Sequence, residues 1–70
     1  MTLSQRKRAY IGREAMFLGY DGKMYVATVS AVWPRGISIE YPVTLNDGRT
    51  RLCTANLTTK DARQRVVVQP

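Results

Sequence analysis

Histidine is absent from the 70-residue chain, and Cys53 is its only cysteine. An intrachain disulfide needs two thiols, and zinc sites are built mainly from cysteine and histidine, so the sequence predicts neither. Catalytic triads that use imidazole as the base are excluded for the same reason. We therefore expect no metal and no cofactor, and we expect Cys53 to be a buried or unreactive thiol.

Acidic residues are also few. Of the five carboxylates, Asp21 and Asp47 each precede a glycine in a predicted turn, where backbone geometry explains them. No two carboxylates form a recognisable acid–base motif, and the five glycines are scattered, with no phosphate-binding loop among them. The sequence therefore predicts a protein that is not an enzyme.

Long apolar stretches are missing as well. No segment approaches the roughly 20 apolar residues that a membrane-spanning helix needs. Residues 1–10 are charged and lack the apolar stretch of a signal peptide. We expect a protein that does not enter membranes and that stays in the cytoplasm, in the host cell if it is viral.

The sequence is rich in turn signals and short strand-like segments. Asp21-Gly22, Pro34-Arg35-Gly36 and Asn46-Asp47-Gly48 are typical of turns. Strands are predicted over residues 14–19, 24–33, 37–41, 49–54 and 66–68. Five short strands in a chain of one-domain length favour a small all-β barrel over residues 13–70.

The sequence leaves the secondary structure of two segments undecided. Residues 1–12 form either a flexible basic arm or a short helix that Ser4 caps and Gly12 ends. Residues 55–59 predict a turn or a single 3₁₀ turn, and residues 59–65 alternatively form one helical turn before the last strand.

Alternation along the strands assigns side chains to two faces. Ala15, Phe17, Tyr25, Ala27, Val29 and Leu52 are expected to face inward. Met16, Leu18, Met24, Val26, Val32 and Val67 are expected on the opposite face. The pairing register of residues 24–33 is not fixed by the sequence to better than one residue. A shift of one residue would move every side chain of this strand to the opposite face.

A barrel of this size cannot bury both faces of every strand. The outward apolar residues are therefore expected to be exposed, unless a protein partner or a second copy in a homo-oligomer covers them. Alternatively, the N-terminal segment folds over them through Leu3, Tyr10 and Ile11.

Residues 13–68 resemble Tudor-like and SH3-like domains. The resemblance rests on Ala15-x-Phe17, Asp21-Gly22, Tyr25-x-Ala27-x-Val29 and Gly36-x-x-Ile39-x-Tyr41, and on Ala55-Asn56-Leu57 followed by Val66-Val67-Val68. It implies a five-stranded SH3/Tudor-like barrel. It also implies an aromatic cage for methylated lysine or arginine, with candidates Phe17, Tyr20, Tyr25 and Tyr41. Pro42-Val43-Thr44 departs from the acidic or Asn residue usual in the family, and core packing is the alternative role of these rings.

Positive charge is the strongest functional signal. Eleven Lys and Arg against five Asp and Glu give a formal net charge of +6, which favours a polyanionic partner. The candidate phosphate-binding residues are Arg6, Lys7, Arg8, Lys23, Arg35, Arg49, Arg51, Arg63 and Arg65. Tyr20, Tyr25 and Trp33 are candidates for stacking on unpaired bases.

The sequence thus predicts a non-enzymatic module that binds DNA or RNA mainly through phosphates. The alternatives are an adaptor or inhibitor of the phage or mobile-element type that docks on a host protein, an acidic protein partner, or a methyl-lysine or methyl-arginine reader.

Overall fold

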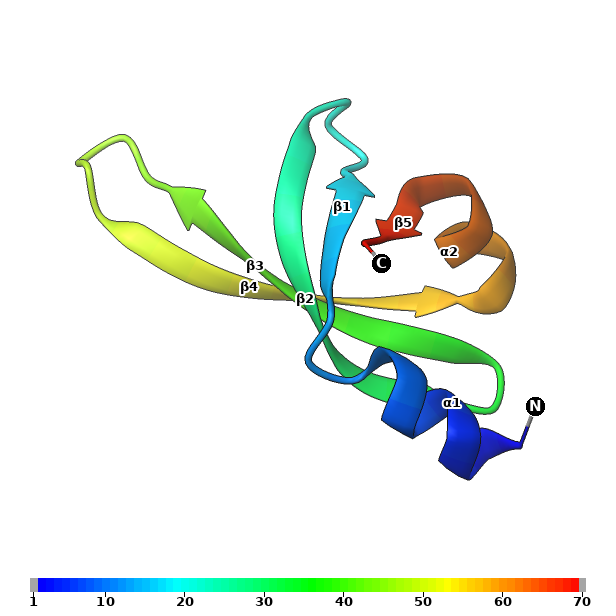
Figure 1. The fold of residues 1–70 in the computed structure, drawn as a ribbon. Coiled ribbons are helices and arrows are strands. Elements are labelled where there is room, and N and C mark those ends of the chain that lie inside the picture. Colours follow the sequence, from blue (N-terminus) through cyan, green and yellow to red (C-terminus); the bar gives the residue numbers. More distant parts are fainter. Residues whose placement is uncertain (1, 70) are drawn as a thin grey trace.

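Five strands and two short helices make up the protein, and the computed structural model describes residues 2–69 (Figure 1). Their order along the chain is α1 (Leu3–Tyr10), β1 (Glu14–Leu18), β2 (Met24–Trp33), β3 (Gly36–Thr44), β4 (Thr50–Thr58), α2 (Thr59–Arg65) and β5 (Val66–Val68).

The strands form one antiparallel sheet in the order β4-β3-β2-β1-β5. The prediction of a small five-stranded β protein is confirmed in this form. The sheet is bent but open, because β4 and β5 are its two outer strands and do not pair with each other. The turn expected over residues 55–59 is wrong, since β4 continues to Thr58. The helical alternative for residues 59–65 is confirmed as α2.

The two Asp-Gly turns form as predicted. Gly22 and Gly48 have φ values of 82° and 85°, which glycine adopts without a steric penalty. The carboxylates of Asp21 and Asp47 accept hydrogen bonds from the backbone amides of Lys23 and Arg49, two residues on.

The N-terminal segment is a helix, and Thr2 caps it in place of Ser4. The Thr2 hydroxyl accepts from the Gln5 amide at 3.2 Å, and the Gln5 side chain accepts from the Thr2 amide at 2.8 Å. This reciprocal pair is a capping box. Ser4 lies within the first turn, so the prediction that it caps the helix is wrong.

A bulge in β2 changes which side chains face the core. Val29 pairs with Ile39 and Ala31 pairs with Ser38, so Ser30 is an extra residue in the ladder. Beyond it the alternation shifts by one position. Val32, expected on the outer face, is therefore buried at 1% exposure, whereas Trp33 is 54% exposed.

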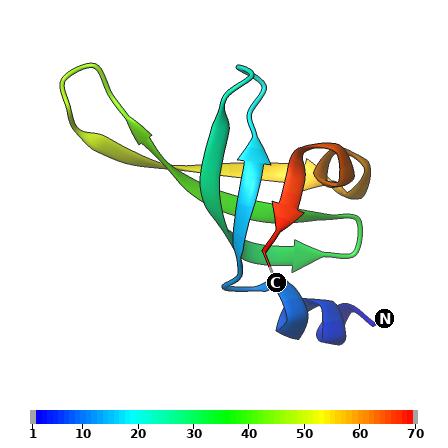
Figure 2. The same cartoon turned by 45° about the horizontal axis from the view of Figure 1, so that its top comes forward.

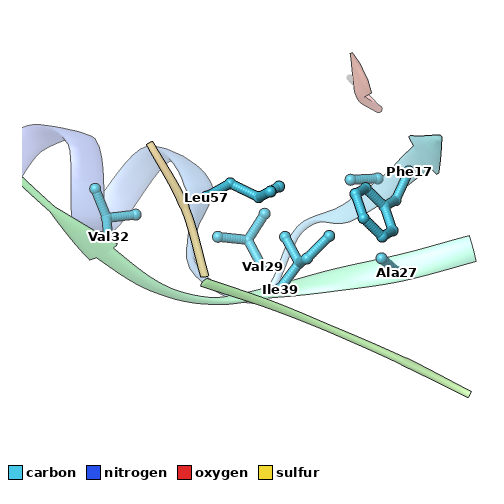
Figure 3. Close-up of a cluster of buried hydrophobic side chains, with 7 residues drawn as sticks. Phe17, Ala27, Val29, Val32, Ile39 and Leu57 are labelled. Atoms are coloured by element: carbon cyan, nitrogen blue, oxygen red, sulfur yellow. The ribbon is translucent and has the colours of Figure 1, made fainter. Parts of the chain in front are cut away.

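The core lies on the inner face of the bent sheet. Its buried apolar side chains are Ala15, Phe17, Ala27, Val29, Val32, Ile39 and Leu57 (Figure 3). Leu3 and Tyr10 of α1 and Ala62 of α2 pack against this cluster. The N-terminal segment thus completes the core and leaves the outer face open.

The outer face is defined by Met16, Leu18, Met24, Val26 and Val67 and is largely apolar. Leu18, Met24, Val26 and Val67 are exposed, as the alternation predicted. Leu52 was expected inward but is 63% exposed. The register places Ala55 opposite the buried Ile39 and Leu52 opposite Pro42, so the odd-numbered residues of β4 face the core.

The β3–β4 hairpin extends beyond the rest of the sheet. β2 pairs with β3 only as far as the Thr28–Glu40 pair, whereas β3 and β4 stay paired out to Thr44 and Thr50. Residues 41–53 thus form a two-stranded arm that points away from both helices (Figures 1 and 2). This arm accounts for the elongated shape of 43 × 20 × 20 Å.

Candidate functional site

The net charge is concentrated in three short segments. The two helices and the turn between β2 and β3 hold seven of the eleven basic residues and one of the five acidic residues, a local net charge of +6. The four basic and four acidic residues elsewhere cancel. The sheet and its other turns are therefore neutral overall, and the excess charge belongs to the helices and this one turn.

Hydrogen bonds hold these three segments together at one end of the molecule. The Arg6 guanidinium of α1 donates to the carbonyls of Trp33 and Pro34, each at 3.3 Å. The amide of Thr59, the first residue of α2, donates to the Arg35 carbonyl at 2.9 Å. Each helix is thereby hydrogen-bonded to the β2–β3 turn, whose position is seen in Figure 1. We call this region the basic end; its basic residues are Arg6, Lys7, Arg8, Arg35, Lys60 and Arg63, and its one acidic residue is Asp61. Arg65, the last residue of α2, lies outside it, because its guanidinium is bonded to the carbonyls of Leu18 and Gly19.

The start of α2 follows from its sequence. The Thr58 hydroxyl accepts from the Asp61 amide at 3.2 Å and caps the helix. Lys60 and Arg63 are exposed and lie three residues apart, so they share one side of the helix. Sequence reasoning missed Lys60, although a helix over residues 59–65 would have grouped it with Arg63.

A cleft of about 240 Å³ opens between α1 and α2. Its walls are mainly apolar and include Tyr10, Val29, Ala62 and Val66, while Arg6 and Arg63 also line it. Two cationic side chains beside an apolar cleft attract an anionic group and leave room for an apolar one.

Trp33 lies on the outer side of the sheet at the basic end. Its indole N–H donates to the Ser38 hydroxyl at 2.9 Å, and this hydroxyl donates to the Asn56 side chain at 2.6 Å. The chain of bonds runs from β2 across β3 to β4. The indole is therefore held in one orientation although Trp33 is 54% exposed.

The other candidate aromatic residues have partners within the protein. Phe17 is 1% exposed, and the rings of Phe17, Tyr25 and Tyr41 pack on one another, with centroids 4.9 Å apart for Tyr25 and Tyr41 and 5.2 Å apart for Phe17 and Tyr41. Tyr20 is exposed, but the Arg65 guanidinium lies 4.0 Å from its ring centroid. These rings pack against the core or against a cation of the chain.

One ring is also tied to a carboxylate. The Tyr25 hydroxyl donates a hydrogen bond to Asp21, which holds the pKa of Asp21 below its ordinary value of 3.8. The same bond raises the pKa of Tyr25 above 10.0, since the bond is lost when the phenol ionises.

The predicted basic residues divide between separate places. Arg6, Lys7, Arg8, Arg35 and Arg63 lie at the basic end, as described above. Arg49 and Arg51 lie on the distant arm, where Arg49 forms an ion pair with Asp47 at 2.9 Å. Arg65 donates to the carbonyls of Leu18 and Gly19, and Lys23 lies in the β1–β2 turn.

Within residues 2–69, no three carboxylate or cysteine side chains gather as metal ligands would. Cys53 is half-buried opposite Tyr41. No helix in the same residues is long and apolar enough to cross a membrane. No protein-family model matches the chain, and neither a curated protein nor a solved structure matches it.

Proposed function

We propose that this protein binds nucleic acid through its basic end and performs no catalysis. The observation that carries the proposal is the charge partition: the basic end has six basic residues and one acidic residue, a net charge of +5 out of the +6 of the chain, and the rest of the chain is close to neutral. A compact cationic surface on a neutral scaffold suits a polyanion better than it suits general solubility, which scattered charges would serve equally well.

Arginine and lysine at this end bind phosphates. Arg35 and Arg63 are exposed, and the guanidinium group of each can hold a phosphate with two parallel hydrogen bonds. Arg6 is engaged with backbone carbonyls, so it contributes mainly by holding α1 in place. Because phosphates carry no base sequence, binding is expected to be driven by counterion release and to be largely independent of sequence.

Paired charge removals test the location. In Arg35→Gln/Arg63→Gln, two positive charges are lost from the basic end. In the matched control Arg49→Gln/Arg51→Gln, two are lost from the arm, and all four side chains are exposed. Binding of labelled single- and double-stranded DNA and RNA is measured by fluorescence anisotropy over a range of salt concentrations.

The basic-end variant is expected to bind more weakly. Its slope of log K against log salt is expected to fall by about 1.4 to 1.8, since two phosphate contacts are lost and each contributes about 0.7 to 0.9. The arm variant is expected to change the slope by much less. Equal losses in both variants would contradict the location, and no binding by the unaltered protein at low salt would contradict the function.

We also propose that the open sheet is related to SH3-like and Tudor-like barrels. The antiparallel strand order supports this, as does the single short helix between β4 and β5. The methyl-reader alternative gains no support, because Phe17 is buried and the rings of Tyr25 and Tyr41 pack together.

Docking on a protein is the second candidate function, and the outer face favours it. Leu18, Met24, Val26 and Val67 form an exposed apolar surface on adjacent strands β2, β1 and β5. A contact made here would change little with salt, in contrast to phosphate binding. The substitution Val26→Lys would abolish such a contact and leave nucleic-acid binding intact.

A further inference from the structure

The structure separates Trp33 from the other candidate aromatic residues. Phe17 is buried, Tyr25 and Tyr41 pack on each other, and the exposed Tyr20 ring has the Arg65 guanidinium 4.0 Å from its centroid. Trp33 alone among these candidates combines high exposure with a position at the basic end. Its neighbours in the turn are Pro34 and Arg35, and α1 and α2 are both bound to that turn.

The indole is exposed and at the same time fixed. Its N–H is bonded to Ser38, which is in turn bonded to Asn56 on the next strand. Ser38 is 5% exposed, so the acceptor is part of the packed sheet. A large exposed side chain usually loses rotamer freedom when it binds a ligand, and this loss has already occurred for Trp33.

A shallow, mainly apolar groove runs beside the indole. Ile37, Leu57 and Thr58 line it together with Trp33 and Arg35. An aromatic surface, an apolar groove and a guanidinium group therefore lie next to one another. This combination matches a nucleotide, whose flat base stacks on an aromatic ring while its phosphate pairs with arginine.

We infer that Trp33 is a stacking platform for an unpaired base, and that the basic end therefore prefers single-stranded DNA or RNA to a duplex. The inference rests on the proposed function and specifies its substrate. In a duplex each base is stacked between its neighbours, so its faces are not open to a fixed indole. In a single strand the bases are free to leave their neighbours, and a phosphate can still reach Arg35, which lines the same groove as Trp33.

Trp33 is the only tryptophan of the chain, so its fluorescence reports on this position alone. The 70-residue protein is titrated at one salt concentration with three unlabelled ligands of equal length: a single-stranded oligothymidylate, a duplex, and an abasic single strand with the same phosphates. The oligothymidylate is expected to quench Trp33 fluorescence and to bind about 5- to 150-fold more tightly than the abasic strand, the range of one base–aromatic stack.

Substitutions separate stacking from charge. Trp33→Leu is expected to bind the oligothymidylate no more tightly than the abasic strand, while its affinity for the abasic strand is unchanged. Both affinities are measured by fluorescence anisotropy with labelled strands. Trp33→Phe retains a ring and is expected to retain part of the difference. Tyr20→Leu is the matched control, since it removes an exposed ring outside the basic end and is expected to change neither affinity. Circular dichroism checks that each variant is folded.

The outcomes distinguish this inference from the function on which it rests. Binding of all three ligands with equal affinity and without quenching would overturn the role of Trp33 and leave phosphate binding intact. No binding of any ligand would overturn both. If Tyr20→Leu lowered the affinity for the oligothymidylate as much as Trp33→Leu does, this would also contradict the assignment of base stacking to Trp33.

Discussion

At the scale of single residues, Asp21 joins the β1–β2 turn to the ring cluster of the core. Its carboxylate accepts from the Lys23 amide within the turn and from the Tyr25 hydroxyl on β2. Tyr25 in turn packs on Tyr41 of β3. The bond is strongest between an ionised Asp21 and a protonated Tyr25, so its contribution to stability depends on pH both in the acidic and in the alkaline range.

The sign follows from the two pKa shifts. The pKa of Asp21 is lowered in the folded state, so its contribution is present above 3.8 and is lost as the pH falls through the folded pKa. The pKa of Tyr25 is raised, so its contribution is present below 10.0 and is lost as the pH rises through the folded value. Tyr25→Phe is expected to move the pKa of Asp21 back towards 3.8, as measured by NMR titration of the carboxyl carbon. An unchanged pKa would show that the bond does not cause the shift.

At the scale of the element, Gly36 fixes the close approach of β3 and β4. A Cβ added to Gly36 would overlap the carbonyl oxygen of Leu57 on the neighbouring strand. Gly36 also pairs with Trp33 and Thr58, so a shift here would disturb the β2–β3 turn and the start of α2.

Gly36→Ala is therefore expected to lower the free energy of unfolding by about 1 to 3 kcal/mol, the usual cost of overpacking. Urea denaturation measures the change. Thr44→Ala is a control in the same strand, where the side chain is exposed and the expected change is within about 0.5 kcal/mol. A Gly36→Ala protein as stable as the unaltered one would mean that β3 and β4 separate easily at this point.

At the scale of the whole molecule, stability is unevenly distributed. The helices and the buried side chains lie around the bent part of the sheet, while the arm beyond the Thr28–Glu40 pair has two strands only. A two-stranded hairpin is marginally stable by itself. Tyr41 is the residue at which the arm joins the ring cluster.

Backbone amides paired between residues 43–44 and 50–51 are expected to exchange with deuterium faster than those paired between Ile37–Ile39 and Ala55–Leu57, because the arm opens without unfolding the core. Hydrogen exchange followed by NMR makes the comparison. Equal protection in both groups would indicate that the arm and the core unfold as one unit.

Local chemistry explains why much of the fold was predictable. The Asp-Gly turns depend on neighbouring residues, and the spans of β2 and β5 depend on runs of β-branched and aromatic residues, so both could be predicted from the sequence. The outward direction of Leu18, Met24, Val26 and Val67 follows from the alternation of side chains within each of their strands, without reference to the pairing between strands. The Thr2 cap was missed because Ser4 is an equally good capping residue by type, and only the geometry of the first turn distinguishes the two.

The faces beyond the bulge and the grouping of the charges depend on contacts between distant segments. The extra residue at Ser30 appears only when β2 pairs with β3, and it buries Val32 and exposes Trp33. The sheet register likewise turns Leu52 outward. The basic end exists because Arg6 and Thr59, far apart in the chain, bind the same turn, which leaves Arg49 and Arg51 on the opposite arm. Strand pairing and helix docking are non-local, so local sequence patterns carry little information about them.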